Sequence, residues 1–375
     1  MYTIKTTDLI LKKQTKREHF FSKELRVISR SGLHMIEKNL IEQLREYGTD
    51  GEILILENRT GVLPMAYQHF YPNSNIDVQN LDIHHSKTVL RTFKQNEFNK
   101  LTPETKATLD ETKKYDLIIF QLAVDVETEL IQDILQQIHI SLNKNGFLII
   151  SRIGKSQFIL NNLKTIFGGS SLLQGKKSGQ VDIAKKKNEL KKIKNFKANF
   201  ELTLTEKQPI LLASIPGVFA HRRVDQGALA IIESIELKEK EVILDLGCGC
   251  GSMGITLGKQ NETTEVHFVD SSARAIHMTN ENAEANQLEN YFVHLSDEGI
   301  KKKNHFTLVV GNPPYFSDYK IAEMFLQNAY NNLKKGGRIF IVAKSIEWYI
   351  ERMQSLFGNQ QILNRRGYKI ITSTK

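Results

Sequence analysis

The segment Gly311-Asn312-Pro313-Pro314-Tyr315 combines residue types that can hold and orient an amine. Its two prolines fix the backbone and remove two N–H donors, so the carbonyl groups of Asn312 and Pro313 can point into a pocket as acceptors. The side-chain oxygen of Asn312 adds an acceptor, and the Tyr315 ring can stack on a base. An exocyclic amine held in this way directs its lone pair at an electrophilic carbon, and transfer then needs orientation more than a strong base. Taken alone, the segment could also be a simple turn between a strand and a helix.

A glycine-rich segment earlier in the chain is a candidate cofactor site. Residues 242–251, with the sequence VILDLGCGCG, form an apolar strand that runs into Gly247, Gly249 and Gly251. Glycines let the backbone turn tightly and approach a ligand closely, but dinucleotide sites share this pattern. Asp245 decides between the two, because its carboxylate stabilises the cationic amino-acid part of S-adenosyl-L-methionine and repels a pyrophosphate. The sequence therefore favours S-adenosyl-L-methionine over NAD, and a methyl group as the one transferred.

Two further carboxylates follow predicted strands. Asp270 comes directly after the apolar strand 265–269, where a carboxylate can accept hydrogen bonds from two ribose hydroxyls. Asp297 follows the third predicted strand, 291–295, and can accept a hydrogen bond from the adenine amino group. The alternative for Asp297 is a loop or helix-cap residue. Both positions suit the nucleoside part of a cofactor.

One pattern of elements occurs twice along the chain. The apolar runs 52–56 and 115–119 correspond to 242–246 and 306–310, at offsets of 190 and 191 residues. In each half the second run is followed by a helical stretch, a glycine and another apolar run. Alternating strands and helices imply a parallel sheet that is covered by helices on both faces and binds ligands at the carboxyl ends of its strands. The sequence thus predicts an α/β protein with two tandem Rossmann-like domains, residues 1–205 and 206–375.

Composition narrows the class of protein. The 375 residues are 40% hydrophobic and 25% charged, as in ordinary folded domains, and no apolar stretch is long enough to span a bilayer. With no apolar signal-peptide region at the start, we expect a cytoplasmic protein that does not enter a membrane. The only two cysteines, Cys248 and Cys250, cannot supply a zinc-ligand set, so they are interpreted as packing residues and no metal is expected.

The charge distribution suits a polyanionic partner. The formal net charge is +9, and nine lysines lie between Lys176 and Lys197. Lysines that neutralise phosphates release counterions and strengthen binding to a nucleic acid. The lysine-rich segment either closes the first domain as a basic strand pair or is a flexible connector. Its lysines either contact an RNA backbone or form an ordinary solvated face.

Taken together, the chain resembles the two-domain ribosomal RNA guanine-N2 methyltransferases, which belong to the class I S-adenosylmethionine-dependent enzymes. The resemblance covers nearly the whole chain and rests on the duplication, on residues 216–220 with Asp225 and Gly227, and on residues 245–251 and 312–315. It implies methyl transfer to the N2 amine of a guanine in ribosomal RNA, with Asn312, Pro313 and Tyr315 as catalytic residues. It also implies ribosomal RNA or a ribosomal subunit as partner, and we expect the protein to be a monomer.

In that family the N-terminal copy has lost cofactor binding and supports RNA recognition and folding. The first half of this chain agrees, because the residues that align with the cofactor and catalytic positions differ from those of the second half. In place of Asp245, Gly247, Gly249 and Asp270 the first half has Ile55, Glu57, Arg59 and Asn80, and in place of residues 312–315 it has Gln121-Leu122-Ala123-Val124.

The chain departs from the family pattern at two positions. It has Ala220 where the family commonly has serine and Tyr315 where phenylalanine is common. Tyrosine there is also typical of adenine-N6 and protein-glutamine methyltransferases, so these acceptors are alternatives to guanine. The segment 216–219 is more similar to the small-subunit branch. A non-catalytic RNA-binding assembly protein with a vestigial site is a third alternative.

Overall fold

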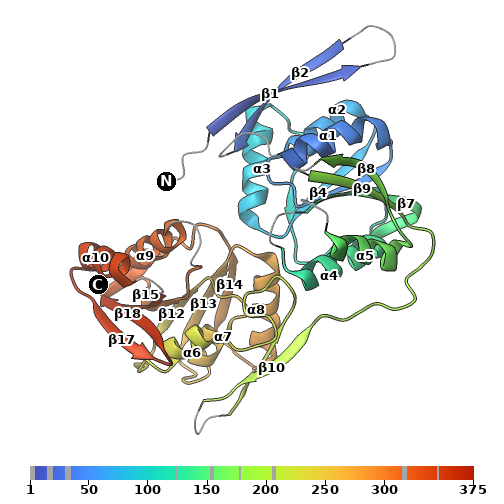
Figure 1. Cartoon of the computed structure of the whole chain (residues 1–375). Coiled ribbons are helices and arrows are strands. Elements are labelled where there is room, and N and C mark those ends of the chain that lie inside the picture. The colour runs from blue at the N-terminus through green and yellow to red at the C-terminus, as the bar shows by residue number, and fades with distance from the viewer. Residues whose placement is uncertain are drawn as a thin grey trace. The chain divides into compact units, whose positions relative to one another are not determined.

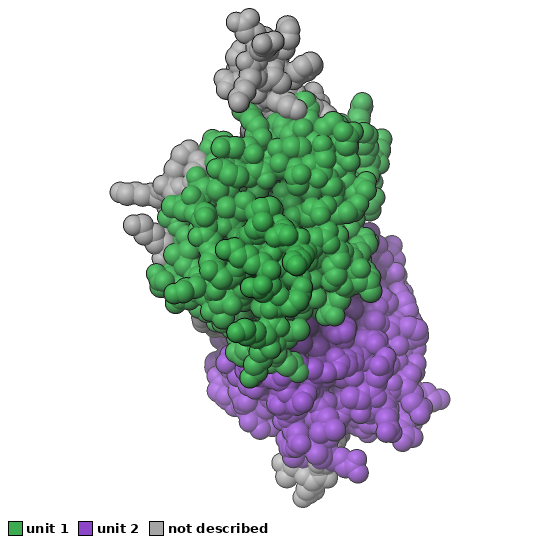
Figure 2. Space-filling view, turned by 90° about the vertical axis from the view of Figure 1, so that its right-hand side faces the viewer, with its two compact units in different colours: residues 1–195 green, residues 196–375 purple. Residues whose placement is uncertain are grey.

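The computed structural model describes residues 5–14, 20–29, 35–122, 126–152, 156–176, 179–204, 208–314, 319–343 and 346–375. It divides into two compact units, Met1–Asn195 and Phe196–Lys375, shown in different colours in Figure 2. Each unit contains a seven-stranded sheet. The predicted α/β class with two tandem domains is confirmed. Within the described ranges, no helix has the length and apolar character needed to cross a membrane.

The C-terminal unit has the strand order β14-β13-β12-β15-β16-β18-β17. Strands β12 to β16 pair in parallel. At one edge, β18 pairs antiparallel with β16 and β17 pairs antiparallel with β18. The strands are β12 (Val242–Leu246), β13 (Glu265–Asp270), β14 (Tyr291–Leu295), β15 (Phe306–Gly311), β16 (Leu333–Ala343), β17 (Gln361–Arg365) and β18 (Tyr368–Thr374). The helices are α6 (Gln226–Ile232), α7 (Ser252–Gly258), α8 (Ala273–Ala285), α9 (Lys320–Asn332) and α10 (Ile346–Phe357).

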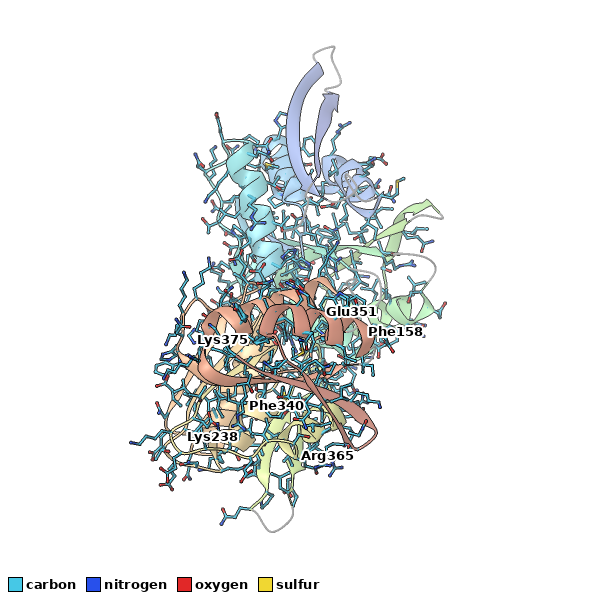
Figure 3. The ribbon with its side chains drawn as sticks, turned by 90° about the vertical axis from the view of Figure 1, so that its left-hand side faces the viewer. Phe158, Lys238, Phe340, Glu351, Arg365 and Lys375 are labelled. Carbon is cyan, nitrogen blue, oxygen red and sulfur yellow. The ribbon has the colours of Figure 1, made fainter. Side chains whose placement is uncertain are left out.

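Helices cover both faces of this sheet, as Figure 1 shows. Alternate residues of each strand pack into two separate cores, because successive side chains of a strand point to opposite faces. One core joins the sheet to α6, α7 and α8, and the other joins it to α9 and α10. In Figure 3, Phe340 marks the buried strand β16 and Glu351 the exposed side of α10.

The N-terminal unit repeats this topology with the order β5-β4-β3-β6-β7-β9-β8. The predicted duplication is therefore a duplication of the whole sheet. Its strands are β3 (Glu52–Leu56), β4 (Asn75–Asn80), β5 (Glu104–Thr105), β6 (Tyr115–Gln121), β7 (Leu142–Arg152), β8 (Ser171–Lys176) and β9 (Gly179–Lys185), and a separate antiparallel pair is formed by β1 (Lys5–Gln14) and β2 (Phe20–Ser29). The helices are α1 (Met35–Tyr47), α2 (Val62–Phe70), α3 (Ile83–Gln95), α4 (Thr128–Ser141) and α5 (Gln157–Phe167).

The units divide at Asn195, earlier than the boundary that the sequence places near residue 205. The reason is the strand β10 (Ala198–Leu202), which pairs antiparallel with β11 (Ile210–Ser214) in the C-terminal unit. The lysine-rich segment is divided as well. Its first part lies in the antiparallel pair β8 and β9, whereas residues 186–197 connect this pair to β10 without regular structure.

Candidate active site

The glycine turn and Asn312 lie at the same edge of the C-terminal sheet. Strands β12 and β15 are parallel neighbours, and Leu246 at the end of β12 pairs with Gly311 at the end of β15. The two predicted sites, 65 residues apart from Gly247 to Asn312, therefore adjoin. A shared pocket is lined by Phe200, Phe219, Ala220, Arg223, Val224, Asp225, Ala228, Gly247, Cys248, Gly249, Cys250, Ser252, Met253 and Asn312.

The glycine turn has the backbone conformation that its sequence predicts. Gly247, Gly249 and Gly251 have φ angles of 68°, 59° and 82°, a region that side-chain-bearing residues rarely adopt. Gly251 also begins helix α7. A Cβ atom built on Gly249 would meet nothing within 4 Å, so the turn presents bare backbone to open space at this point. This is the close backbone approach that a ligand requires.

Asp245 is fully buried at the end of β12. Its Oδ2 accepts a hydrogen bond of 2.9 Å from the Gly254 amide, whereas its Oδ1 has no hydrogen-bond partner among the described residues. Burial raises the pKa of Asp245 to about 7, and the nearby Asp270 carboxylate adds to the rise while the Gly254 amide opposes it. A cation beside Oδ1 would reverse this effect, because an opposite charge favours the ionised form.

Asp270 links the end of β13 to the glycine turn. Its Oδ2 accepts a hydrogen bond of 3.0 Å from the Gly249 amide, and its Oδ1 accepts one of 2.9 Å from the Ser272 amide. These bonds hold the carboxylate beside the bare backbone of Gly249. The residue is half-buried, so part of the carboxylate stays accessible to a ligand.

Asp297 lies farther from this centre. It follows β14, whose last residue Leu295 pairs with Asp270, and the next amide, Ser296 N–H, donates to the Asp270 carbonyl at 2.8 Å. Asp297 is thus at the correct edge of the sheet, after the neighbouring strand, and, like Asp245 and Asp270, it is not among the residues that line the pocket. Its assignment to the adenine stays a prediction.

Asn312 is held in one orientation by Asp225. The Nδ2 group of Asn312 donates a hydrogen bond of 2.6 Å to Asp225 Oδ2, and Asn312 Oδ1 is buried without a hydrogen-bond partner among the described residues. Asp225 is itself fixed, because it caps α6 by accepting from the amides of Gly227 and Ala228. The side-chain oxygen of Asn312 is therefore left as the acceptor at the pocket.

The other residues of the tetrapeptide are only partly described. Pro313 is buried and Pro314 is half-buried. Tyr315 lies outside the described residues, so its predicted stacking role stays a prediction.

Asp225 is a functional candidate that sequence reasoning did not single out as a site residue. It lies 87 residues before Asn312, and only the packing of α6 against the sheet brings the two together. The sequence did mark this position, because Asp225 and Gly227 are among the residues that carry the family resemblance, although no role was assigned to them. A Cβ atom on residue 227 would lie 3.1 Å from Asn312 Nδ2, a tight contact that glycine avoids. Phe219, which is 65% exposed, also lines the pocket.

The two cysteines are buried and unpaired, as expected of packing residues. Burial raises the pKa of the Cys250 thiol to about 11 and that of Cys248 well above its usual value. Cys248 Sγ lies 3.4 Å from Thr279 Oγ1. Neither thiol is ionised at neutral pH, so neither is a nucleophile there.

The corresponding edge of the N-terminal sheet is closed by its own polar side chains. Glu57 Oε1 accepts a hydrogen bond of 2.6 Å from the Leu81 amide, and burial raises the pKa of Glu57 to about 7. Asn58 Nδ2 donates at 3.3 Å to Gln121, the residue in the place of Asn312. Thr60 donates in turn to Glu37 of α1. Glu57, Asn58 and Gln121 thus engage groups of their own unit, whereas Asn80 Oδ1, at the place of Asp270, has no hydrogen-bond partner among the described residues.

Comparisons with known proteins agree with this geometry. The family model of the methyltransferase small domain matches residues 209–372, which contain every residue of the candidate site except Phe200. The protein YbxB of Bacillus subtilis, which is uncharacterised, is 30% identical over 190 residues, covering 49% of this chain and 94% of that protein. The chain belongs to the methyltransferase small domain family.

Curated proteins that are named ribosomal RNA methyltransferases are also similar to part of this chain. Ribosomal RNA small subunit methyltransferase C of Pseudomonas entomophila is 31% identical over 193 residues, which cover 50% of this chain and 57% of that protein. The enzyme of the same name from Pseudoalteromonas translucida is 36% identical over 152 residues, covering 40% and 44%. The matched region thus spans about half the length of these relatives.

The fold likeness extends over the whole chain. The structure of T. thermophilus RsmC, a 16S rRNA N2 methyltransferase solved in complex with AdoMet and guanosine, has a TM-score of 0.76 and 19% identity, covering 98% of both chains. Both tandem units therefore belong to a known arrangement of secondary structure.

Proposed function

We propose that this protein transfers a methyl group from S-adenosyl-L-methionine to the N2 amine of a guanine in small-subunit ribosomal RNA. One observation carries the proposal. The buried Oδ1 of Asn312, which has no hydrogen-bond partner among the described residues, lies in the same pocket as the bare backbone of Gly249. An acceptor for an amine and a place for a cofactor thus adjoin in a chain of the methyltransferase small domain family.

The residues present fit S-adenosyl-L-methionine, which supplies an electrophilic methyl group bonded to a positively charged sulfur. Asp245 offers a buried oxygen without a partner among the described residues, suited to the cationic amino-acid part of the cofactor. Gly247, Gly249 and Gly251 allow the backbone to lie against the cofactor, and Asp270 would accept the ribose hydroxyls. Asp297 is assigned to the adenine amino group.

Around the amine that receives the methyl group, Asn312 Oδ1 would accept a hydrogen bond from one N–H. The backbone carbonyls of Asn312 and Pro313 would accept a hydrogen bond from the other N–H. Held in this way, the nitrogen lone pair points along one line toward the methyl carbon. Holding the amine in this orientation lowers the entropic part of the activation barrier to methyl transfer, so the site needs no strong base. Tyr315 is assigned to stack on the base.

Three observations favour ribosomal RNA over the alternatives. The similar family members named by substrate act on small-subunit ribosomal RNA, and the whole-chain fold is that of an N2 methyltransferase of 16S rRNA. The net charge of +9 suits a polyanion better than a protein-glutamine substrate. The N-terminal unit, with its closed pocket, is assigned to RNA recognition and folding support. We expect a monomer that acts in the cytoplasm on the small subunit or its RNA.

Mapping of modified nucleosides tests the proposed function. Small-subunit ribosomal RNA from cells without this protein should lack one N2-methylguanosine that the parent strain has. The wild-type gene should restore it, whereas the Asn312→Ala variant should not, although the variant should still bind most of the cofactor. An unchanged set of N2-methylguanosines would overturn the substrate, and full restoration by Asn312→Ala would overturn the role of Asn312 as amine acceptor.

A further inference from the structure

A second cluster of chemically active side chains lies at the opposite edge of the C-terminal sheet. Glu265 is the first residue of β13, whereas Asp270 of the proposed cofactor site is the last. His267 follows on the same face of β13, and His305 directly precedes β15. Strand β12 lies between β13 and β15, so these side chains meet above its first residues. Nothing in the proposed methyl transfer uses them.

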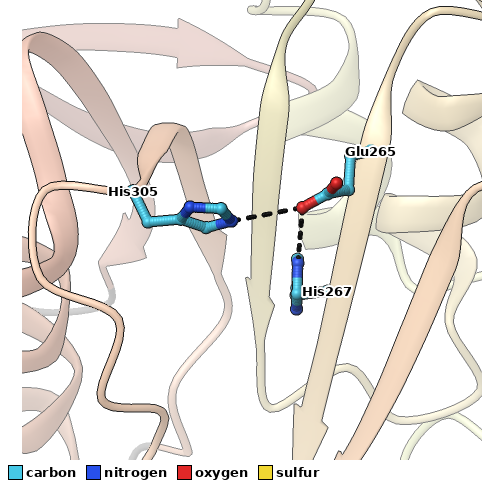
Figure 4. Close-up of side chains that lie close together, drawn as sticks. All are labelled: Glu265, His267 and His305. Atoms are coloured by element: carbon cyan, nitrogen blue, oxygen red, sulfur yellow. Dashed lines mark hydrogen bonds and ion pairs between the residues drawn. The ribbon is translucent and has the colours of Figure 1, made fainter.

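The two histidine side chains both approach one carboxylate oxygen of Glu265, as Figure 4 shows. Glu265 Oε1 lies 2.8 Å from His267 Nε2 and 3.2 Å from His305 Nε2. All three donor atoms lie within 4.8 Å of one another. Two imidazole nitrogens and one carboxylate oxygen are the ligand set of many three-residue zinc sites.

His267 is held rigidly in this cluster. Its side chain is fully buried and stacks on the rings of Phe292, at 4.7 Å, and His294, at 5.2 Å. Its second ring nitrogen, Nδ1, lies 2.9 Å from His294 Nε2. Ligating histidines usually have their other ring nitrogen engaged by a neighbouring group, which fixes the tautomer and the ring orientation. His294 supplies that engagement here.

The proton count of the cluster leaves room for a cation. If His267 donates through Nδ1 to His294, its Nε2 lone pair faces the Glu265 carboxylate and a cation between the two groups would bind both; with the opposite tautomer, Nε2–H donates to Glu265.

The distances need only a small adjustment. Two donors at about 2.0 to 2.1 Å from one tetrahedral zinc ion lie about 3.3 Å apart, close to the observed 2.8 and 3.2 Å. Glu265 and His305 are 27% and 36% exposed, so an ion has a path from solvent and its fourth position can hold water. His305 lies outside the regular strands, where it can move by a few tenths of an ångström.

We propose that Glu265, His267 and His305 form a structural site for one divalent transition-metal ion, best suited to Zn²⁺, with His294 as its positioning residue. The ion fastens the segment before β15 to the start of β13, across β12, and braces the sheet at the edge away from the pocket. From the sequence alone no metal is expected, because the two cysteines cannot supply a zinc-ligand set. The ligands here are separated by up to 40 residues and are assembled by the sheet.

Zinc titration of the full chain tests the site. Protein stripped with a chelator should bind one Zn²⁺ per chain by calorimetry, and saturation should raise the melting temperature by roughly 3 to 8 °C. Co²⁺ in place of Zn²⁺ should give the visible absorption of a tetrahedral ion with nitrogen and oxygen ligands. Absence of stoichiometric binding, or binding without any rise in melting temperature, would overturn the proposal.

Variants locate the ion. His305→Ala and Glu265→Gln remove partly exposed ligands and should weaken zinc affinity at least about tenfold, and His294→Ala should weaken it about 10- to 100-fold through His267. His277→Ala is the matched control, because His277 is also an exposed histidine near a glutamate, 3.9 Å from Glu281. Wild-type affinity in His305→Ala, or an equal loss in His277→Ala, would show that zinc binds elsewhere. Circular dichroism of each metal-free variant separates loss of binding from loss of fold.

Discussion

At the scale of single residues, the candidate site contains buried polar atoms that accept no hydrogen bond from the described residues. Asp245 has one buried oxygen with no partner among the described residues, and Asn312 has another. A buried acceptor left without a hydrogen bond destabilises a protein by about 1 to 3 kcal/mol. A ligand at the strand ends would complete both groups, so these two residues support the proposed cofactor and amine positions together with the glycine turn.

Asp245→Asn should stabilise the cofactor-free protein and weaken cofactor binding. The folded pKa of Asp245, about 7, is raised above its ordinary value of 3.8, so the native state holds the proton more tightly than the unfolded state. Stability therefore falls as pH rises from about 4 to about 7 and is lowest above it. At about 1.4 kcal/mol for each pH unit in this window, ionisation destabilises the fold by up to about 4 kcal/mol.

Thermal unfolding of both proteins between pH 4 and pH 9, without cofactor, measures this effect. The stability gained by Asp245→Asn should grow up to pH 7 and then stay constant, while calorimetry at pH 8 should show weaker binding of S-adenosyl-L-methionine. Parallel pH profiles of the two proteins would mean that Asp245 does not titrate in this range.

Asp225→Ser should slow methyl transfer without loss of the cofactor. Serine can still cap α6 but is too short to reach Asn312. The Asn312 side-chain amide can then rotate, and its Oδ1 no longer holds the amine in line with the methyl group. We expect turnover to fall about tenfold to a hundredfold, while the cofactor dissociation constant changes less than about twofold. Single-turnover kinetics with saturating cofactor measure the first quantity and calorimetry the second. An equal loss in both would assign Asp225 to the cofactor site.

At the scale of elements, parallel pairing decides which residues meet. The order β14-β13-β12-β15 puts the carboxyl ends of four strands in one row, which gathers Asp297, Asp270, Asp245 and Asn312 at one edge. The same pairing gathers the amino ends at the other edge, where the proposed metal ligands lie. Each edge thus receives its chemistry from residues that are remote in sequence.

In the connector of residues 186–197, some lysine side chains are exposed and others are engaged by neighbouring groups. Lys187, Lys191 and Lys192 are exposed, whereas Lys186 is buried and donates to the Leu142 carbonyl at 3.1 Å. Lys197 forms an ion pair with Glu281. Only part of the lysine-rich segment is therefore available to an RNA backbone.

Replacing Lys191 and Lys192 by alanine should weaken RNA binding and reduce its salt dependence. For every phosphate that a lysine no longer neutralises, the slope of log affinity against log salt should flatten by roughly 0.7 to 0.9. Lys334 and Lys335, which are equally exposed at the start of β16, provide the control pair with the same loss of charge. Filter binding of small-subunit RNA at several salt concentrations compares the pairs. Equal slopes for the two double variants would indicate a solvated face that binds no particular phosphate.

At the scale of the whole molecule, one sheet topology serves two purposes. Gly61 begins α2 with a φ of 82°, as Gly251 begins α7, so the duplicated turn kept its backbone. The side chains changed instead. Glu57, Asn58 and Gln121 engage groups of their own unit, and Arg59 stands where Gly249 leaves bare backbone in the C-terminal unit.

The full chain should accordingly bind one S-adenosyl-L-methionine. Asp270→Ala should weaken cofactor binding by more than tenfold, because each charge-assisted hydrogen bond to the ribose contributes about 1.5 to 3 kcal/mol. Asn80→Ala, at the equivalent position of the N-terminal unit, is the matched control and should leave both stoichiometry and affinity unchanged. Calorimetry of the three full-length proteins gives both quantities. A stoichiometry of two, or a loss of affinity in Asn80→Ala, would assign a working site to the N-terminal unit.

Much of this protein is determined by the sequence alone. The two α/β halves, the glycine turn and the strand-end positions of Asp245, Asp270 and Asn312 are predictable, because strand and helix periodicity and turn chemistry act over a few residues. The duplication is readable for the same reason.

Tertiary structure decided what depends on contacts between distant segments. The unit boundary moved to Asn195 because β10 found its partner in β11. Asp225 became the residue that orients Asn312 because α6 packs at the end of β15. Glu265, His267 and His305 lie close together because only β12 separates the strands β13 and β15 near which they stand, and this proximity underlies the proposed metal site. Hydrogen bonds and metal ligation need atoms placed within a few tenths of an ångström, and only the folded sheet sets positions to that tolerance.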